Sequence, residues 1–174
     1  MNVPALATRF DDWAELQLER VRGNPGADIV FTTASKLGEF SLIWHATNVA
    51  RRVAGVGTSE QLPVFAILLG AESLLVNQGI KRLFRRVRPT EAGDERYPVR
   101  RPLTSSFPSG HASSAAFAAT VLSGWDGPPL AALWWTMAGT VAVSRAYVRI
   151  HHASDVVAGL ATGVTLGLAA RRFV

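Results

Sequence analysis

Three short stretches of this chain hold the residues whose types and spacing could carry out chemistry. Residues 81–89 read KRLFRRVRP, residues 105–114 read SSFPSGHASS, and residues 144–155 read SRAYVRIHHASD. Together they supply cations, hydroxyl groups, and histidines close to a carboxylate. Such groups bind an anion and exchange protons with it, so the sequence points first to chemistry on an anionic substrate.

The first stretch carries two cations at helical spacing. Lys81 and Arg88 are seven residues apart, which is about two turns of an α-helix, so both can point the same way. Pro89 then ends the helix and opens a loop. By itself, the stretch also fits a collar of cations at the edge of a membrane.

The second stretch places Ser109, Gly110 and His111 directly before an apolar run that begins near Ala112. The N-terminus of a helix offers free backbone N–H groups and the positive end of the helix dipole, which together bind anions. Gly110 lets the backbone approach a ligand closely, Ser109 adds a hydroxyl group, and His111 stands where it could give or take a proton. The plainer alternative is an N-cap by Ser109 beside a solvated histidine.

The third stretch pairs a histidine with a carboxylate one helical turn away. His151 and Asp155 are four residues apart, so the carboxylate can accept a hydrogen bond from one ring nitrogen and leave the other free to attack a substrate. His152, three residues from Asp155, is an alternative base, and a purely structural histidine–aspartate cap is another interpretation. Arg145 follows a charge-free run, where a cation without an anion is costly.

Apolar segments separate these stretches and must position them. Four nearly charge-free runs have 14 to 20 residues each, at or below the roughly 20 that cross a bilayer core: 61–80, 112–125, 128–144 and 156–170. They leave little of the chain to coat them, and their small residues allow close helix packing in lipid. Residues 27–50 are apolar but hold several charges. We therefore predict an all-α integral membrane bundle of about five to six helices, in preference to a soluble bundle.

Residues 1–23 predict an amphipathic N-terminal helix. Within 5–22 the apolar residues fall close to one face, and the acidic residues interrupt the uniform apolar core that a signal peptide needs. That face comprises Leu6, Phe10, Trp13, Leu18 and Val21. Two placements suit such a helix: packed on the body of the protein, or lying in the membrane interface.

The composition limits the remaining possibilities. We expect a single domain over residues 1–174, and a chain without cysteine has neither disulfides nor a thiol nucleophile. The net charge of +5 arises within residues 81–101, which hold eight basic and three acidic residues. A local positive patch suits an anionic ligand or lipid headgroup, and it excludes a polycation that coats nucleic acid.

The order of the elements predicts that the three stretches meet. If the four apolar runs are successive antiparallel helices, segments 81–111 and 145–155 lie on the same side of the bundle. The opposite side then holds Arg51, Arg52, Arg171 and Arg172. Taking these arginines as cytoplasmic, we expect a multi-pass protein of the cell membrane with its site on the extracytoplasmic side.

The three stretches together resemble the complete signature of the type-2 phosphatidic acid phosphatase superfamily. The pattern covers residues 81–155 in the family's order: Lys81-x6-Arg88-Pro89, Pro108-Ser109-Gly110-His111, and Ser144-Arg145-x5-His151-x3-Asp155. The family includes membrane lipid phosphatases, bacterial undecaprenyl pyrophosphate phosphatases, glucose-6-phosphatase and soluble vanadium haloperoxidases. A lone Pro-Ser-Gly-His would be weakly specific, whereas all three parts together are highly specific.

The resemblance implies a role for each site residue. His151 would be the nucleophile that forms a phosphohistidine, Asp155 would orient it, and His111 would be the general acid and then the base. The residues that would hold the phosphoryl oxygens are Lys81, Arg88, Ser109, Gly110 and Arg145. The family needs no metal, so we expect no cofactor.

The resemblance also implies a substrate class and leaves alternatives open. We expect a membrane lipid phosphate, with polyprenyl phosphates and pyrophosphates ranked ahead of phosphatidate and phosphatidylglycerophosphate; the bilayer is the other partner. The alternatives are a vanadium haloperoxidase-like enzyme, disfavoured by the apolar helices, and a non-catalytic lipid-binding protein, disfavoured by the intact catalytic residues. Because segment 90–107 leaves little room for a lid, lipid would enter sideways between helices. The sequence does not indicate an oligomeric state.

Overall fold

The computed structural model describes residues 5–89, 96–97, 99 and 104–174. In this part of the chain all regular structure is helical, as predicted. The α-helices are α1 (Ala5–Glu19), α2 (Pro25–Leu37), α3 (Leu42–Val53), α4 (Gln61–Leu74), α5 (Gly110–Asp126), α6 (Pro128–Tyr147) and α7 (Ala153–Ala170). Most of segment 90–107, where we expected little room for a lid, lies outside the described residues, as do residues 1–4.

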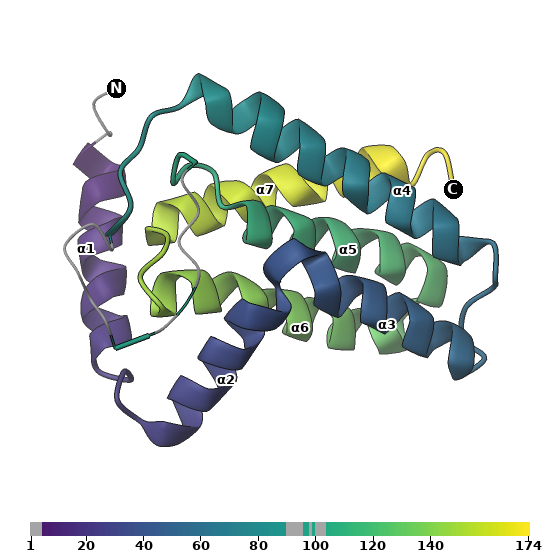
Figure 1. The fold of residues 1–174 in the computed structure, drawn as a ribbon, viewed down its shortest axis with the longest axis horizontal. Helices are drawn as coiled ribbons and strands as arrows, with labels where there is room; N and C mark the ends of the chain where they lie inside the picture. The colour runs from purple at the N-terminus through teal and green to yellow at the C-terminus, as the bar shows by residue number, and fades with distance from the viewer. Residues whose placement is uncertain (1–4, 90–95, 98, 100–103) are drawn as a thin grey trace.

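Helix α5 is the centre of the bundle, with α6 and α7 alongside it (Figure 1). Its residues from Ala112 to Leu122 are all buried. Helix α7 approaches it through glycines at every fourth position, Gly159, Gly163 and Gly167, and a Cβ atom at Gly163 would lie 2.1 Å from the carbonyl oxygen of Ser113. Only glycine permits this separation, so the small residues of the sequence serve close helix packing.

Helix α4 continues beyond its α-helical part toward the site. Leu75–Gly79 form a π-helical turn and Ile80–Leu83 a 3-10 turn. Among the described residues, two helices are long and apolar enough to cross a membrane, namely Gln61–Leu83 and Ala153–Ala170. The π-helical turn changes the direction in which the following side chains point, and it comes directly before the buried Lys81.

The mixed segment 27–50 folds as two helices joined by a break. Phe40 and Ser41 have positive φ angles of 52° and 58°, which no continuous α-helix accommodates. The chain therefore changes direction between α2, which slants across the bundle, and α3, which runs beside α4 (Figure 1). With 13 and 12 residues, neither helix alone has the length of a membrane span.

Helix α1 lies across one end of the bundle (Figure 1), and it packs with its polar face inward. Its buried residues are Asp11 and Ala14. In contrast, the predicted apolar face points outward, with Leu6 79% and Trp13 58% exposed. Leu18 alone of that face packs against buried core residues. Polar contacts rather than hydrophobic burial therefore attach this amphipathic helix to the body.

Candidate active site

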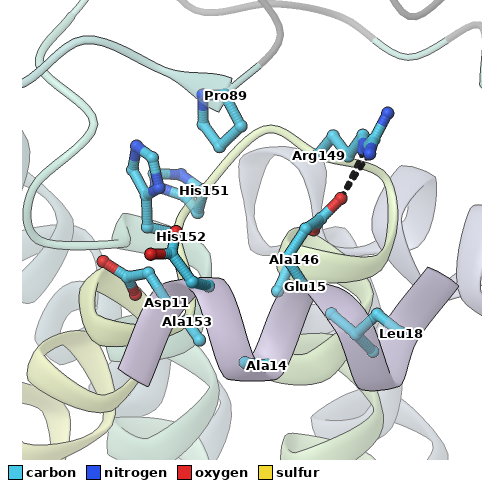
Figure 2. Close-up of a pocket in the computed structure, with 11 residues that line it drawn as sticks. Asp11, Ala14, Glu15, Leu18, Pro89, Ala146, Arg149, His151, His152 and Ala153 are labelled. Carbon is cyan, nitrogen blue, oxygen red and sulfur yellow. Dashed lines mark hydrogen bonds and ion pairs between the residues drawn. The ribbon is translucent and has the colours of Figure 1, made fainter. Parts of the chain in front are cut away.

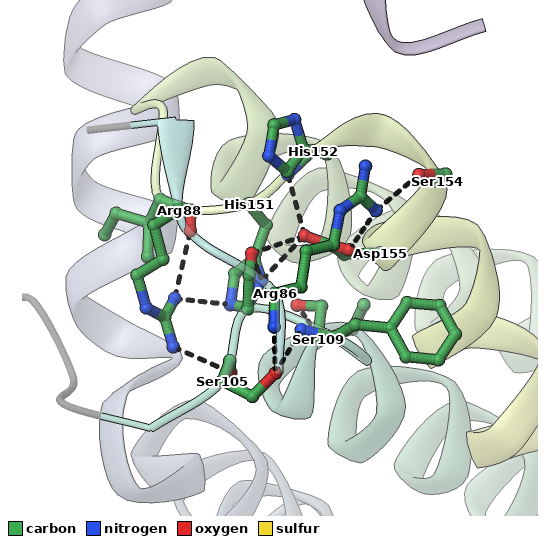
Figure 3. A network of polar contacts seen from close by, with 12 residues as sticks. Arg86, Arg88, Ser105, Ser109, His151, His152, Ser154 and Asp155 are labelled. Atoms are coloured by element: carbon green, nitrogen blue, oxygen red, sulfur yellow. Dashed lines mark hydrogen bonds and ion pairs between the residues drawn. The ribbon is translucent and has the colours of Figure 1, made fainter. Parts of the chain in front are cut away.

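The three chemical stretches meet at the end of the bundle that α1 crosses. The backbone N–H of Ser109 donates to the carbonyl oxygen of Asp155 at 3.0 Å, joining the second stretch to the third. Arg88 donates to the carbonyl oxygen of Ile150 at 2.9 Å, joining the first to the third. The Lys81 ammonium lies 3.4 Å from where a Cβ atom of Gly110 would be. The predicted convergence of the stretches is therefore present in the folded chain (Figure 3).

One side of the His151 ring faces a carboxylate. Nδ1 of His151 lies 3.6 Å from Oδ2 of Asp155. The hydroxyl of Ser106 donates to the same Oδ2 at 2.5 Å and lies 3.4 Å from Nδ1. The backbone N–H of His152 donates to it as well, at 3.0 Å. These contacts keep Oδ2 beside Nδ1, where it favours the tautomer that carries its proton on that nitrogen.

The other side of the same ring faces the cations. Nε2 of His151 lies 3.2 Å from a guanidinium nitrogen of Arg88, which can only donate, so Nε2 is the acceptor and holds a lone pair. Burial, opposed by the hydrogen bond with Asp155 and reinforced by the nearby cations, lowers the pKa of His151 to about 3. A neutral, oriented imidazole with an unprotonated Nε2 can act as a nucleophile when a phosphate takes the place of the Arg88 contact.

Three cations line the site from separate elements. Arg145 is 1%, Lys81 6% and Arg88 8% exposed. Burial lowers the pKa of Arg88, with partial compensation by Asp155. Buried cations are stable only when an anion or hydrogen-bond acceptors meet them, so this cluster is suited to holding an anion with several oxygens.

Unsatisfied donors gather at the same place. Within the described ranges, the buried side-chain nitrogens without a hydrogen-bond partner are Nε of Arg88, Nε2 of His111 and Nε of Arg145. All three belong to residues that the sequence assigned to the site. Since unpaired buried polar atoms are rare in folded proteins, their convergence supports an anion-binding role.

The Ser109–Gly110 turn has the capping role that the sequence offered as one of its two alternatives. Ser109 is the N-cap of α5, and its hydroxyl accepts from the backbone N–H of Ala112 at 3.4 Å. The residue is also fully buried, and its role in holding a phosphate stays a prediction. A Cβ atom at Gly110 would come within 2.7 Å of Oδ1 of Asn77, so glycine permits close approach of the π-helical turn.

Helix α2 closes the site, which the sequence did not predict. Arg145 donates to the carbonyl oxygen and to the hydroxyl of Ser35, at 3.2 Å for the carbonyl. A Cβ atom at Gly38 would lie 2.9 Å from Cδ2 of His111, so the end of α2 packs directly on that ring. Neither residue carries a local signal, because each acts on a partner more than 70 positions away in the chain.

Two further residues were present in the quoted stretches but not singled out. Ser106 belongs to SSFPSGHASS and Arg86 to KRLFRRVRP. Both donate to Asp155, Ser106 to Oδ2 and Arg86 to Oδ1. Their position inside the quoted stretches was the only signal in the sequence that could have identified them as site residues.

The neighbouring His152 is turned away from the cations. Its ring Nε2 lies 3.2 Å from the carbonyl oxygen of Val87, and its contact with Asp155 is through the backbone. It lines, with His151, a pocket of about 260 Å³ between α1 and the loop before α7 (Figure 2). Across this pocket, burial of Glu15 is outweighed by hydrogen bonds from Arg22 and Arg149, which hold the pKa of Glu15 below its usual value.

Metal-ligating side chains do not gather here. Among the residues that the structure describes, no group of three histidine, cysteine or acidic side chains is placed to hold a metal ion. Asp155, the acidic residue nearest the histidines, is occupied by Ser106, Arg86 and the His152 backbone. The expectation of a metal-free reaction thus stays a prediction for experiment.

Known proteins are similar to this chain in sequence and in fold. The PAP2 superfamily model matches residues 62–174. A decaprenylphosphoryl-5-phosphoribose phosphatase of Mycolicibacterium smegmatis is 34% identical over 140 residues, covering 79% of this chain and 73% of that protein. A protein of the same name from Mycobacterium tuberculosis is 39% identical over 88 residues, covering 51% of this chain and 48% of its own length.

Two solved structures resemble the fold along nearly the whole chain. The transmembrane PAP2 type phosphatidylglycerolphosphate phosphatase of Bacillus subtilis has a TM-score of 0.71 and 26% identity, covering 99% of this chain and 87% of that one. LpxE of Aquifex aeolicus has a TM-score of 0.73 and 24% identity, covering 97% and 96%. The second likeness is one of fold.

Proposed function

This chain belongs to the PAP2 superfamily and is a membrane lipid phosphatase, and from that premise we propose that it cleaves a phosphomonoester through a phosphohistidine on His151. One observation carries the proposal. The His151 ring has Nδ1 against Asp155 and Ser106, and Nε2 against Arg88 within a cluster of buried cations. A lone pair is thereby aimed at the place where a phosphate would bind.

In the first step, Nε2 of His151 attacks phosphorus in line with the ester oxygen. The N–P bond forms as the P–O bond breaks, and His111 gives its proton to the leaving oxygen. Three cations, Lys81, Arg88 and Arg145, stabilise the charge on the equatorial oxygens. Ser109 and the N–H of Gly110 add hydrogen bonds at the N-terminus of α5.

In the second step, water replaces the histidine. His111, now neutral, takes a proton from water as the water oxygen attacks phosphorus. The P–N bond breaks, inorganic phosphate forms, and His151 returns to its starting state. Asp155 stabilises the positive charge on the imidazole ring while Nε2 is bonded to phosphorus.

We propose a polyprenyl-linked lipid as the substrate, with a phosphorylated pentose as the group that loses phosphate. The curated relatives in both mycobacterial species are named for such a lipid. Phosphatidylglycerophosphate ranks second, because the Bacillus subtilis neighbour at 26% identity is named for it. A panel of both lipids and of undecaprenyl pyrophosphate, assayed for phosphate release with and without EDTA, separates these possibilities and tests metal independence.

We further propose a multi-pass arrangement with the site outside the cytoplasm. The C-terminal ends of α3 and α7 lie at the opposite end of the bundle from α1 (Figure 1), and they carry Arg51 and Arg171. This is in keeping with a cytoplasmic side rich in arginine. The chain has no cysteine, so the exposed threonines Thr8 in α1 and Thr58 before α4 can each be replaced by cysteine as a matched pair. In intact cells, an impermeant maleimide should label Thr8→Cys and spare Thr58→Cys; the reverse pattern would overturn the orientation.

Replacing His151, the proposed nucleophile, tests the mechanism. His151→Ala should lower kcat by about 10⁴-fold or more, because covalent catalysis is lost. The wild-type enzyme, quenched during turnover of ³²P-labelled lipid, should hold an acid-labile, alkali-stable phosphate that His151→Ala lacks. His152→Ala is the matched control and should keep the label. Turnover by His151→Ala, or label that survives in it, would refute the assignment.

A further inference from the structure

We propose that Arg86 is a positioning residue for the reaction, and that it makes helix α1 part of the catalytic apparatus. The inference rests on the proposed role of His151 and Asp155. Arg86 lies between α1 and the start of α7. Its guanidinium donates to Asp11 in α1, and also to Ser154 and Asp155 at the start of α7 (Figure 3 shows the contacts with α7). It stands in the first stretch but is distinct from the Lys81–Arg88 pair, and nothing in the spacing of the motifs assigns it a role.

The two carboxylate oxygens of Asp155 contact different partners. Oδ2 faces Nδ1 of His151 and accepts from Ser106. Oδ1 accepts from the Arg86 guanidinium at 2.5 Å. A carboxylate turns about its terminal bond unless both oxygens are held. The Arg86 contact therefore fixes the rotation that keeps Oδ2 beside the histidine.

Arg86 is itself held by α1. Its second guanidinium nitrogen donates to Oδ2 of Asp11 at 2.6 Å, and its first also donates to the hydroxyl of Ser154 at 2.8 Å. The arginine and the two carboxylates are 14%, 8% and 0% exposed, so the pairs are shielded from water. A shielded guanidinium between two carboxylates has a defined position, because leaving either charge alone is costly.

Asp11 fastens α1 to the start of the catalytic helix as well. Its Oδ1 accepts from the backbone N–H of Ser154 at 2.7 Å, and its Oδ2 accepts from the Ser154 hydroxyl at 2.8 Å. Ser154 lies in the first turn of α7, next to Asp155. A carboxylate at this place satisfies a free N–H group of the helix terminus. Thus α1 positions the turn that carries the orienting carboxylate.

This network lies partly outside the region that defines the family. The PAP2 model begins at residue 62, whereas Asp11 stands in α1, 75 positions before Arg86. It also explains why α1 buries Asp11 and exposes Trp13. The helix is oriented by its ionic contacts with the site, and it contributes to catalysis without touching the phosphate.

Arg86→Ala tests the proposal in the full-length enzyme in detergent micelles. We expect kcat to fall about 10- to 100-fold, the scale of a misplaced catalytic group. KM should change by no more than about threefold, because substrate contacts are kept. Arg86→Lys should recover most of the loss, since an ammonium can still reach Oδ1. The exposed Arg85→Ala removes the same charge one residue away and should leave kcat unchanged.

A double-mutant cycle separates positioning from a general loss of stability. Asp11→Asn alone should lower kcat by a smaller factor than Arg86→Ala, because asparagine can still accept from the backbone N–H of Ser154 but no longer forms the ion pair with Arg86. It should add little when combined with Arg86→Ala, because that ion pair is then already absent. Independent, multiplicative losses, or an unchanged kcat in both Arg86→Ala and Arg86→Lys, would overturn the proposal. If Arg86→Ala does not fold, Arg86→Lys and Asp11→Asn decide the matter by their kcat values. Loss of activity in His151→Ala beside a fully active Arg86→Ala would refute only this inference, whereas an active His151→Ala would refute the proposed function.

Discussion

Each end of the bundle has a buried arginine, but in the part of the chain that the structure describes only one of these two arginines is paired with a carboxylate. At the end away from α1, Arg51 pairs with Asp126, and Asn48 accepts from it at 2.8 Å. Asp126 also accepts from the indole N–H of Trp134 at 2.9 Å. At the site end, Arg145 donates to Ser35, forms no ion pair among the described residues, and leaves Nε unpartnered.

Under the proposed function, this contrast distinguishes a structural cation, Arg51, from a substrate-binding one, Arg145. A buried arginine with a carboxylate is neutralised within the fold and contributes to stability only if the pair stays intact. A buried arginine without a carboxylate remains an uncompensated charge, and in our proposal the phosphate of the substrate compensates it. We therefore expect stability to depend on the arginine at one end and activity to depend on the arginine at the other.

Replacing each of the two arginines by alanine should give the largest effects, on activity in one case and on stability in the other. Arg145→Ala should lower kcat/KM by about 10²- to 10³-fold through loss of charge stabilisation, with little loss of stability. Arg51→Ala should lower the free energy of unfolding by about 3–5 kcal/mol because it strands Asp126, while activity per folded molecule stays near wild type. Steady-state kinetics and thermal unfolding in detergent measure both. If either variant lowered both activity and the free energy of unfolding to a similar extent, the proposed difference between Arg145 and Arg51 would be wrong.

Two serines with buried hydroxyl groups, Ser106 and Ser123, allow a test with a smaller expected effect. Ser106→Ala should lower kcat about tenfold, because Asp155 loses a charge-assisted hydrogen bond beside His151. Ser123 lies in the opposite half of α5, and its buried hydroxyl oxygen has no hydrogen-bond partner in the described part of the chain. Ser123→Ala should therefore leave kcat unchanged. Equal effects from the two serines would argue against a role for Ser106 in orienting the carboxylate.

The pH dependence of stability should also come from the site end. The pKa of His151 falls from 6.5 to about 3 on burial. Between these values the unfolded chain binds the proton and the folded chain does not, so stability decreases as pH falls through this range and is fully present above it. His151→Asn should flatten the decrease in melting temperature between pH 6.5 and pH 4. An unchanged slope in the variant would assign the dependence to other groups.

Inorganic phosphate should give the smallest effect, a shift in melting temperature, and this shift tests whether Arg145 binds the anion. At millimolar concentration it should raise the melting temperature of the wild-type enzyme by a few degrees, because a ligand that binds only the folded state stabilises it. Arg145→Ala should lose this shift, and Arg51→Ala should keep it. Sulfate at the same ionic strength controls for salt. A shift that persists in Arg145→Ala would place the anion elsewhere.

Prediction from the sequence succeeded where the signal is local. The apolar runs correspond to α4 through α7, and the four-residue spacing of His151 and Asp155 does bring ring and carboxylate together. Prediction was incomplete where partners are distant. The break at Phe40 divides segment 27–50, and Ser35 meets Arg145 from 110 positions away. No periodicity within a segment encodes such contacts.

Helix α1 is the clearest case in which the sequence pattern did not determine which side of an element is buried. Its pattern predicted an apolar face, and hydropathy alone leaves open whether such a face meets the protein or the lipid. The folded chain turned Asp11 inward, because Arg86 and the first turn of α7 present donors that only a carboxylate satisfies. The burial of these donors depends on the packing of α7 and the first stretch.

By itself, the sequence determined the helical class, the membrane character and the set of groups that can handle a phosphate, because hydropathy and short-range spacing are properties of neighbouring residues. Only the tertiary structure decided which cations stay without carboxylates, which oxygen of Asp155 faces His151, and which side of α1 is buried. These depend on atoms that are brought together by folding, and the free energy of a buried charge is set by those neighbours rather than by its place in the chain.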